Sequence, residues 1–145
     1  MAYTHVAHDC VVGNHCILAN NASIAGHVHV GDYAILGGMT GVHQFCHIGA
    51  HSFVAANTLI LKDIPPYLMV SGQPASPFGL NSEGLKRRGF DKNVILMIKR
   101  AYKEVYRKGL NVNEALVNVE ALADDMPELT FFADFIRNSS RGIAR

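Results

Sequence analysis

The sequence predicts a mixed β and α fold, in which a parallel β-helix is followed by a small C-terminal helical domain. Three observations predict it: an aliphatic residue returns every six positions, this repeat stops at a Pro-Pro pair, and apolar residues then recur at helical spacing. The 145 residues are 49% hydrophobic and carry a net charge of +1. This composition is typical of a globular chain and excludes an extensively disordered one.

The repeat defines the first domain, residues 1–64. Counting each hexad from its aliphatic residue, the second position is mostly Gly or Ala, and the fifth position is mostly small. One hexad therefore predicts a short strand and a corner, and three hexads make an 18-residue coil of a triangular prism. Neighbouring coils pair as parallel strands about 4.8 Å apart. Ten positions six apart all carry Val, Ile or Leu: Val6, Val12, Leu18, Ile24, Val30, Leu36, Val42, Ile48, Val54 and Ile60.

All three cysteines occupy the small, inward position of a hexad. Cys10 and Cys46 are two coils apart, about 9.6 Å by the strand spacing, which is too far for a disulfide. Cys16 belongs to another side of the prism, so we expect three buried thiols that pack as small hydrophobic groups. No apolar run reaches the roughly 18 residues that a membrane helix needs. We therefore expect a cytoplasmic protein with no integral membrane segment.

The repeat ends at Pro65-Pro66, which cannot continue a strand ladder, and residues 65–80 are expected to form a crossing loop. Residues 81–145 are expected to form the helical domain. An apolar stripe from Val94 to Val105 predicts its first helix. A second helix is expected to be capped by Asn113, and a third to begin at Pro127.

Eight histidines lie in the first domain, and three of them share one corner of the prism. An 18-residue coil brings His8, His27 and His43 close to this corner on successive coils, with Gly26 and Gln44 in register with His8. Three stacked imidazoles would spread over about 10 Å of rise, whereas zinc needs ligands at about 2.0–2.1 Å. No metal site is therefore expected.

The same column suits acid–base chemistry. A histidine titrates near neutrality, so His8 can take a proton from a hydroxyl group. The adjacent Asp9 can orient the imidazole or stabilise its charged form. The amide of Gly26, which no side chain obstructs, can donate to a developing oxyanion.

The motifs HDC, AGHV, GGMTGVHQF and GLNSEGLKRRGF make the chain resemble bacterial UDP-N-acetylglucosamine O-acyltransferases, which catalyse the first step of lipid A biosynthesis. The resemblance implies a left-handed β-helix and a homotrimer with its site between neighbouring prisms. It implies a 3-hydroxyacyl donor on the phosphopantetheine of acyl carrier protein. The implied acceptor is the glucosamine 3-hydroxyl of UDP-N-acetylglucosamine, and neither a metal nor another cofactor is implied.

The resemblance also assigns roles to residues. It makes His8 the general base, Asp9 its support and Gly26 the donor to the oxyanion. Eight further residues are implied to bind the sugar nucleotide, the acyl group or the carrier: His5, His27, His43, Gln44, Asn81, Glu83, Arg87 and Arg88.

Charge is concentrated in one segment. Residues 86–108 contain nine basic and two acidic residues, a net charge of +7. Such a segment would steer an acidic helical partner such as acyl carrier protein. No nucleic-acid-binding motif accompanies it, so nucleic acid is not expected as a partner. Family members carry further coils before the position of Met1, and two alternatives stay open: a non-catalytic fragment that binds carrier protein or sugar nucleotide, and another hexapeptide-repeat acyl- or acetyltransferase.

Overall fold

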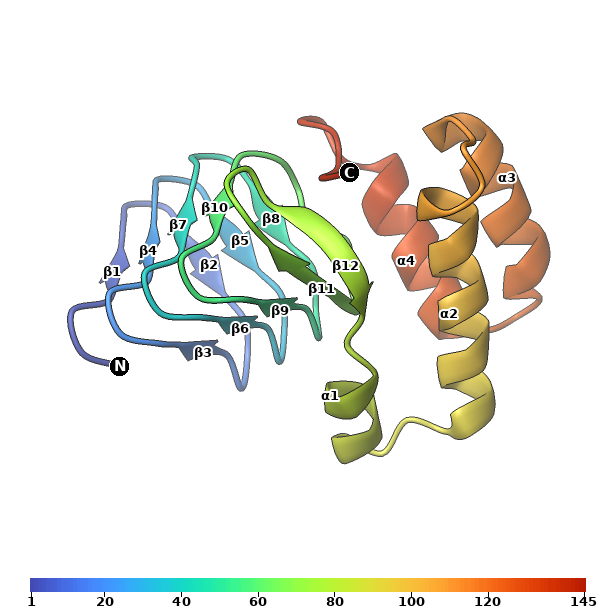
Figure 1. Cartoon of the computed structure of the whole chain (residues 1–145), viewed down its shortest axis with the longest axis horizontal. Coiled ribbons are helices and arrows are strands. Elements are labelled where there is room, and N and C mark those ends of the chain that lie inside the picture. Colours follow the sequence, from blue (N-terminus) through green and yellow to red (C-terminus); the bar gives the residue numbers. More distant parts are fainter. The chain divides into compact units, whose positions relative to one another are not determined.

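Two units make up the chain, which a computed structural model describes over residues 1–145 (Figure 1). The first unit comprises Met1–Asn81 together with Ser139–Arg145, and the second comprises Ser82–Asn138. The C-terminal segment therefore belongs with the coils, whereas residues 81–145 were all expected in the helical domain.

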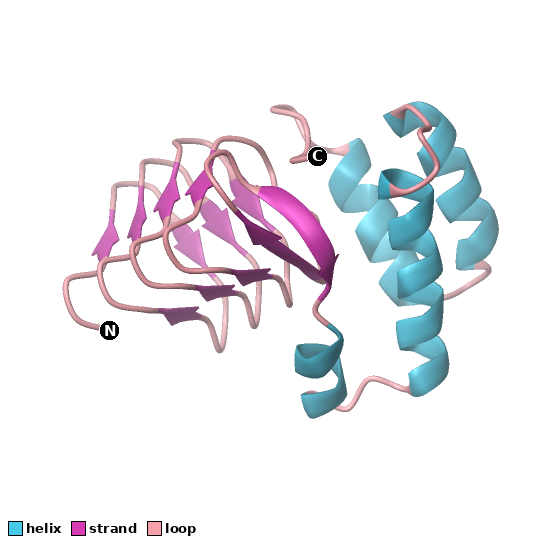
Figure 2. Cartoon of the chain, in the orientation of Figure 1, coloured by secondary structure: helices cyan, strands magenta, loops and turns pink.

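The first unit is a parallel β-helix built from short strands, one on each side of each coil (Figure 2). One sheet has the order β1-β4-β7-β10, a second has β2-β5-β8, and a third has β12-β11-β9-β6-β3. The ten strands of the hexads are β1 (His5–Val6), β2 (Val11–Val12), β3 (Ile17–Leu18), β4 (Ser23–Ile24), β5 (His29–Val30), β6 (Ile35–Leu36), β7 (Gly41–Val42), β8 (His47–Ile48), β9 (Phe53–Val54) and β10 (Leu59–Ile60).

The strand register confirms the predicted 18-residue coil. His5 pairs with Ser23 in the first sheet, and Val11 pairs with His29 in the second, each time in parallel. Between β1 and β10, each strand residue therefore lies beside the residue eighteen positions later. The last coil is shorter, since Phe53 pairs with Met69, sixteen positions later. The arrangement confirms the predicted parallel β-helix with a helical C-terminal part and fits a left-handed coil.

From Ile24 onward, the aliphatic positions of the hexads form the core along the prism axis, whereas Val6 and Val12 are exposed. Ile24, Leu36 and Ile60 are fully buried, and the small fifth positions beside them are buried as well. The prediction for the cysteines is confirmed for Cys46, whereas Cys10 and Cys16 are only half-buried. All three thiols are free, and burial raises the pKa of Cys16 and Cys46.

Leu36 offers a direct test of the axial core. The Leu36→Ala variant should lower the free energy of unfolding by about 2–5 kcal/mol, because it deletes a fully buried side chain and leaves a cavity. Leu59→Ala is the matched control, since Leu59 is 39% exposed and should cost less. Chemical denaturation of both variants measures the difference. Equal losses would contradict the assignment of Leu36 to the core.

The expected crossing loop, residues 65–80, contains two strands. β11 (Leu68–Ser71) pairs in parallel with β9 and antiparallel with β12 (Ser76–Leu80), so the third sheet continues past the prolines. The physical reason is that Pro65-Pro66 occupies a corner, after which Leu68 and Val70 return to the buried positions of a strand.

The buried carboxylate of Asp63 holds the C-terminal segment on the first unit. One oxygen accepts from the backbone N–H of His47 at 2.8 Å, and the other accepts from the hydroxyl of Ser139 at 2.6 Å. The backbone of Asp63 also donates to Gly142 and accepts from Ala144. These contacts explain why the segment after the last helix groups with the coils.

The second unit consists of four helices: α1 (Ser82–Arg87), α2 (Lys92–Tyr106), α3 (Val112–Ala123) and α4 (Pro127–Arg137). Pro127 begins α4, as predicted. The predicted cap of the second long helix is wrong, because the side chain of Asn111, not Asn113, accepts from the N–H of Glu114 at 2.9 Å. None of these helices is long and apolar enough to cross a membrane.

Candidate active site

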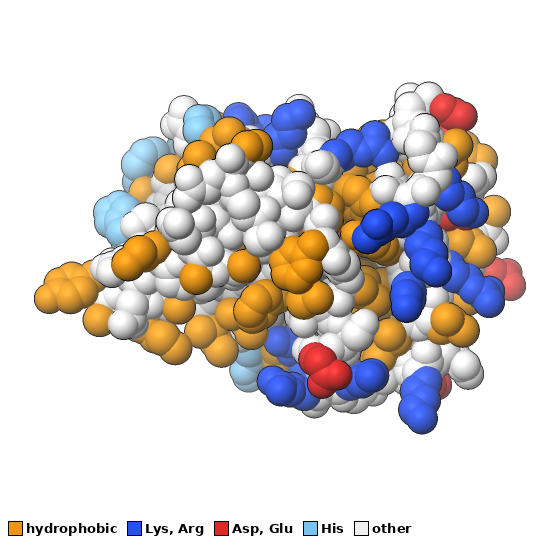
Figure 3. Space-filling view, in the orientation of Figure 1, with side chains coloured by type: hydrophobic (Ala, Val, Ile, Leu, Met, Phe, Trp, Pro, Cys, Tyr) orange, Lys and Arg blue, Asp and Glu red, His pale blue; other side chains and the backbone are white.

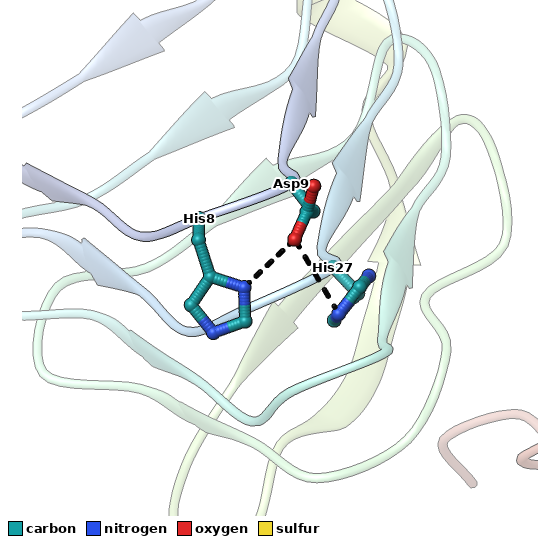
Figure 4. A group of neighbouring side chains, drawn as sticks. All are labelled: His8, Asp9 and His27. Atoms are coloured by element: carbon teal, nitrogen blue, oxygen red, sulfur yellow. Dashed lines mark hydrogen bonds and ion pairs between the residues drawn. The ribbon is translucent and has the colours of Figure 1, made fainter.

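His8 and Asp9 form a hydrogen-bonded pair in the corner that follows β1. The distance from His8 Nδ1 to Asp9 Oδ2 is 3.0 Å (Figure 4). The hydrogen bond from His8, followed by the charge of His27, lowers the pKa of Asp9 below its ordinary value. The ionised carboxylate only accepts, so Nδ1 of His8 carries the proton and Nε2 keeps its lone pair when the ring is neutral. The pair therefore holds His8 in the tautomer that a general base needs.

His27 lies in the same corner one coil later, and its Nε2 is 3.7 Å from Asp9 Oδ2 (Figure 4). Its backbone is left-handed, with φ 60°, as are Asp9 at 59° and Phe45 at 67°. These positions are eighteen residues apart, so their side chains leave the prism in one direction. The ring of His27 stacks on Phe45 at 4.7 Å, with an angle of 8° between the planes. Stacking thus fixes the imidazole beside Asp9.

Gly26 lies beneath the ring of His8, as the register predicts. A Cβ on Gly26 would come within 2.7 Å of two atoms of that ring, so only glycine allows the imidazole to lie there. The neighbouring amides of Ala25 and His27 donate to the carbonyl groups of Val42 and His8, but the amide of Gly26 donates to no carbonyl of the chain. Gly26 is buried and lines the groove described below, so its amide is available to a group bound there.

A groove of about 480 Å³ runs along the sheet β1-β4-β7-β10 and includes Gly26. His5 and His43, two of the residues that the resemblance assigns to substrate binding, line this groove. His43 Nδ1 is 3.1 Å from the carbonyl oxygen of Gln44, and its Nε2 is therefore an acceptor in the neutral ring. Sequence reasoning missed the apolar lining, although the strand register contains it: Ala7, Ser23, Ile24, Ala25, Gly41, Val42, Leu59 and Leu61.

The other predicted site residues lie elsewhere. Asn81 is buried beyond the end of β12, where its amide donates to the carbonyl group of His51 at 2.9 Å, and it does not line the groove. Glu83 and Arg87 belong to α1, and Arg88 follows this helix in the second unit.

The ligand atoms of His8, Asp9 and His27 all lie within 4.8 Å of one another. The sequence argument against a metal considered three imidazoles on three coils. The side chains that converge in the structure are two imidazoles and one carboxylate, and they span a single step between coils.

The basic segment forms an exposed surface on the helical unit. Figure 3 shows Lys and Arg side chains gathered over this unit. Along α2 the exposed basic residues are Lys92, Lys99, Arg100 and Lys103. The surface therefore favours an acidic partner.

Relatives with known names match the whole chain. A protein of Pseudomonas entomophila named acyl-[acyl-carrier-protein]–UDP-N-acetylglucosamine O-acyltransferase is 54% identical over 145 residues, which are 100% of this chain and 56% of the relative. A protein of Thiobacillus denitrificans with the same name matches at the same identity and coverage. The chain thus spans little more than half the length of these relatives.

Solved structures give the same result. The UDP-N-acetylglucosamine acyltransferase of Francisella novicida superposes with a TM-score of 0.97 at 48% identity, over 100% of this chain and 53% of that one. The Arabidopsis UDP-N-acetylglucosamine acyltransferase superposes with a TM-score of 0.91 at 36% identity, over 98% and 53%. Residues 63–144, more than half of the chain, match the family described as UDP N-acetylglucosamine O-acyltransferase, domain 2. The chain therefore belongs to the UDP-N-acetylglucosamine O-acyltransferase family.

Proposed function

We propose that this chain transfers a 3-hydroxyacyl group from acyl carrier protein to the glucosamine 3-hydroxyl of UDP-N-acetylglucosamine, the first step of lipid A biosynthesis. The observation that carries the proposal is the His8–Asp9 pair, whose 3.0 Å hydrogen bond leaves Nε2 of His8 as a base above a glycine with an unpaired amide. The names of the relatives supply the substrates.

In the proposed reaction, Nε2 of His8 takes the proton of the 3-hydroxyl as its oxygen attacks the thioester carbonyl carbon. The amide of Gly26 donates to the carbonyl oxygen as negative charge develops there. The carbon–sulfur bond then breaks, and protonated His8 returns its proton to the departing phosphopantetheine thiolate. Asp9 stabilises the imidazolium between the two transfers. No metal, covalent enzyme intermediate or further cofactor takes part in this scheme.

The groove offers a place for both substrates. Its apolar lining, which includes Ile24, Val42 and Leu59, suits an acyl chain, while His5 and His43 offer polar contacts to the sugar nucleotide. We assign Gln44 to the same contacts, because it lies in the corner that holds His43. The remaining contacts, from Asn81, Glu83, Arg87 and Arg88, belong to the nucleotide or the carrier.

The proposal includes the assembly and the carrier. In a homotrimer with sites between neighbouring prisms, residues on different faces of one chain can serve different sites, which accommodates the place of Asn81 outside the groove. The exposed basic residues of α2 offer a docking surface for acidic acyl carrier protein. We also propose a cytoplasmic location, which is compatible with three free cysteines.

An acyl-transfer assay with two donors tests the proposal. The chain is incubated with UDP-N-acetylglucosamine and either 3-hydroxyacyl carrier protein or acetyl coenzyme A, and the product is identified by mass spectrometry. We expect an O-acylated sugar nucleotide from the carrier protein alone. Transfer from acetyl coenzyme A would indicate an acetyltransferase instead. Binding of both substrates without any product would indicate a non-catalytic binding module.

A further inference from the structure

Three potential metal ligands meet in the corner where the ring of His8 lies over Gly26, a residue that lines the groove. We propose that His8, Asp9 and His27 bind a single divalent transition-metal ion such as Zn²⁺, and that this ion reversibly switches off acyl transfer. The binding site stands on geometry alone, whereas the switch rests on the proposed function.

The spacing of the ligand atoms suits zinc. Ligand distances of about 2.0–2.2 Å in a tetrahedron place neighbouring ligand atoms about 3.3 Å apart. Asp9 Oδ2 is 3.0 Å from His8 Nδ1 and 3.7 Å from His27 Nε2, on either side of this value. All three atoms lie within 4.8 Å of one another, so small rotations of exposed side chains bring them around one ion.

The surroundings favour a cation and leave it accessible. The carboxylate of Asp9 lies between the two imidazoles and supplies a negative charge to the site. No Lys or Arg occurs before Lys62 in the sequence, so the two coils that carry His8, Asp9 and His27 contain no Lys or Arg that would repel the ion. The side chains of His8 and Asp9 are 73% and 66% exposed, which leaves room for water as the fourth ligand.

Ligation would remove the base by a change of tautomer. The ion replaces the proton on Nδ1 of His8, and in the neutral ring the proton then resides on Nε2. Nε2 thereby loses the lone pair that accepts the proton of the sugar hydroxyl. Neutral His8 keeps its one proton, and no net proton is released. The ion should therefore lower kcat even when both substrates are bound.

A cobalt titration tests the binding site without any assay of activity. Co²⁺ added to the metal-free chain should bind at one ion per chain and give the visible absorption of an ion with nitrogen and oxygen ligands. The thiolate-to-cobalt charge-transfer band that a cysteine ligand produces should be absent. Zn²⁺ should displace it. His8→Ala, His27→Ala and Asp9→Asn should each weaken Zn²⁺ binding by about tenfold or more, by analogy with the sensitivity of metal sites to lost partners.

His29→Ala is the matched control for binding. His29 is exposed, and its ring stacks on that of His47 at 4.6 Å on a different sheet. These two histidines form another pair that could attract an ion. The control should keep wild-type affinity. If His29→Ala abolishes binding, or if Zn²⁺ binding is the same in every variant, the proposed site is wrong.

An activity measurement tests the switch separately. Stoichiometric Zn²⁺ should suppress kcat of the wild type and of His29→Ala, and a chelator should restore it. Full activity with Zn²⁺ bound would overturn the switch. If no acyl transfer is found even in metal-free protein, the proposed function and the switch both fail, while the cobalt titration still decides the binding site.

Discussion

Replacing His8 with alanine lowers kcat for acyl transfer by about 10²–10⁴-fold, the usual contribution of a general base. The reason is that no other side chain offers the same arrangement. His8 alone combines a ring nitrogen fixed on Asp9 at 3.0 Å with a position over the unpaired amide of Gly26. The side chain is 73% exposed, so its loss should leave the fold intact.

His29→Ala controls for the loss of a histidine from the coils. Its ring lies on a different sheet from the groove, and the variant should retain wild-type kcat. Steady-state kinetics of both variants, with thermal unfolding to verify the fold, measure the contrast. A folded His8→Ala variant that transfers acyl groups at the wild-type rate would eliminate His8 as the base.

Replacing Gly26 with alanine has the second largest expected effect on activity. The added Cβ would come within 2.7 Å of the imidazole of His8, closer than real Cβ atoms approach other atoms, so the ring must move. A displacement of about 1 Å at a reacting group costs roughly 100-fold in rate. We expect a loss of kcat of that order, measured by the same kinetics.

Gly41→Ala separates displacement of the base from simple filling of the groove. Gly41 lines the same groove, but its added Cβ would meet only Leu59, at an ordinary contact distance of 3.6 Å. This variant should lose far less activity than Gly26→Ala. Equal losses in the two variants would mean that bulk in the groove, rather than the position of His8, limits the reaction.

The coils could be predicted from sequence because their physical constraints recur with a fixed period. An axial position such as Leu36 must be aliphatic in every coil, and an inward position such as Ala34 must be small, so ten repeats reinforce one another. The register then follows from arithmetic, and it brings His8 and Gly26 together without any knowledge of side-chain conformations.

The second half of the chain has no sequence repeat, and its structure depends on contacts between residues that are far apart in the sequence. The C-terminal segment returns to the coils because Asp63 accepts from Ser139, a pairing that no local pattern announces. The hairpin of β11 and β12 extends a sheet past two prolines. The cap of α3 falls on Asn111 because the side chain of that residue reaches the free N–H of Glu114, although Asn113 is equally suitable by type.

The sequence predicts which residues of the site lie in register, but it does not predict the directions of their side chains or the distances between them. Spacing alone aligns His27 with Phe45, yet the left-handed backbone that points both rings outward is visible only in the structure. The same geometry brings His27 to 3.7 Å from Asp9 and forms a three-ligand cluster that the sequence argument did not consider.

Chemical rescue of His8→Ala by free imidazole tests the central claim most directly. The variant leaves a vacant space over Gly26 beside Asp9, and neutral imidazole in that space can take the proton of the sugar hydroxyl. We predict that imidazole restores acyl transfer in a saturable manner and does not accelerate the wild type. If His8→Ala binds UDP-N-acetylglucosamine but saturating imidazole restores no transfer, the assignment of His8 as the general base is contradicted.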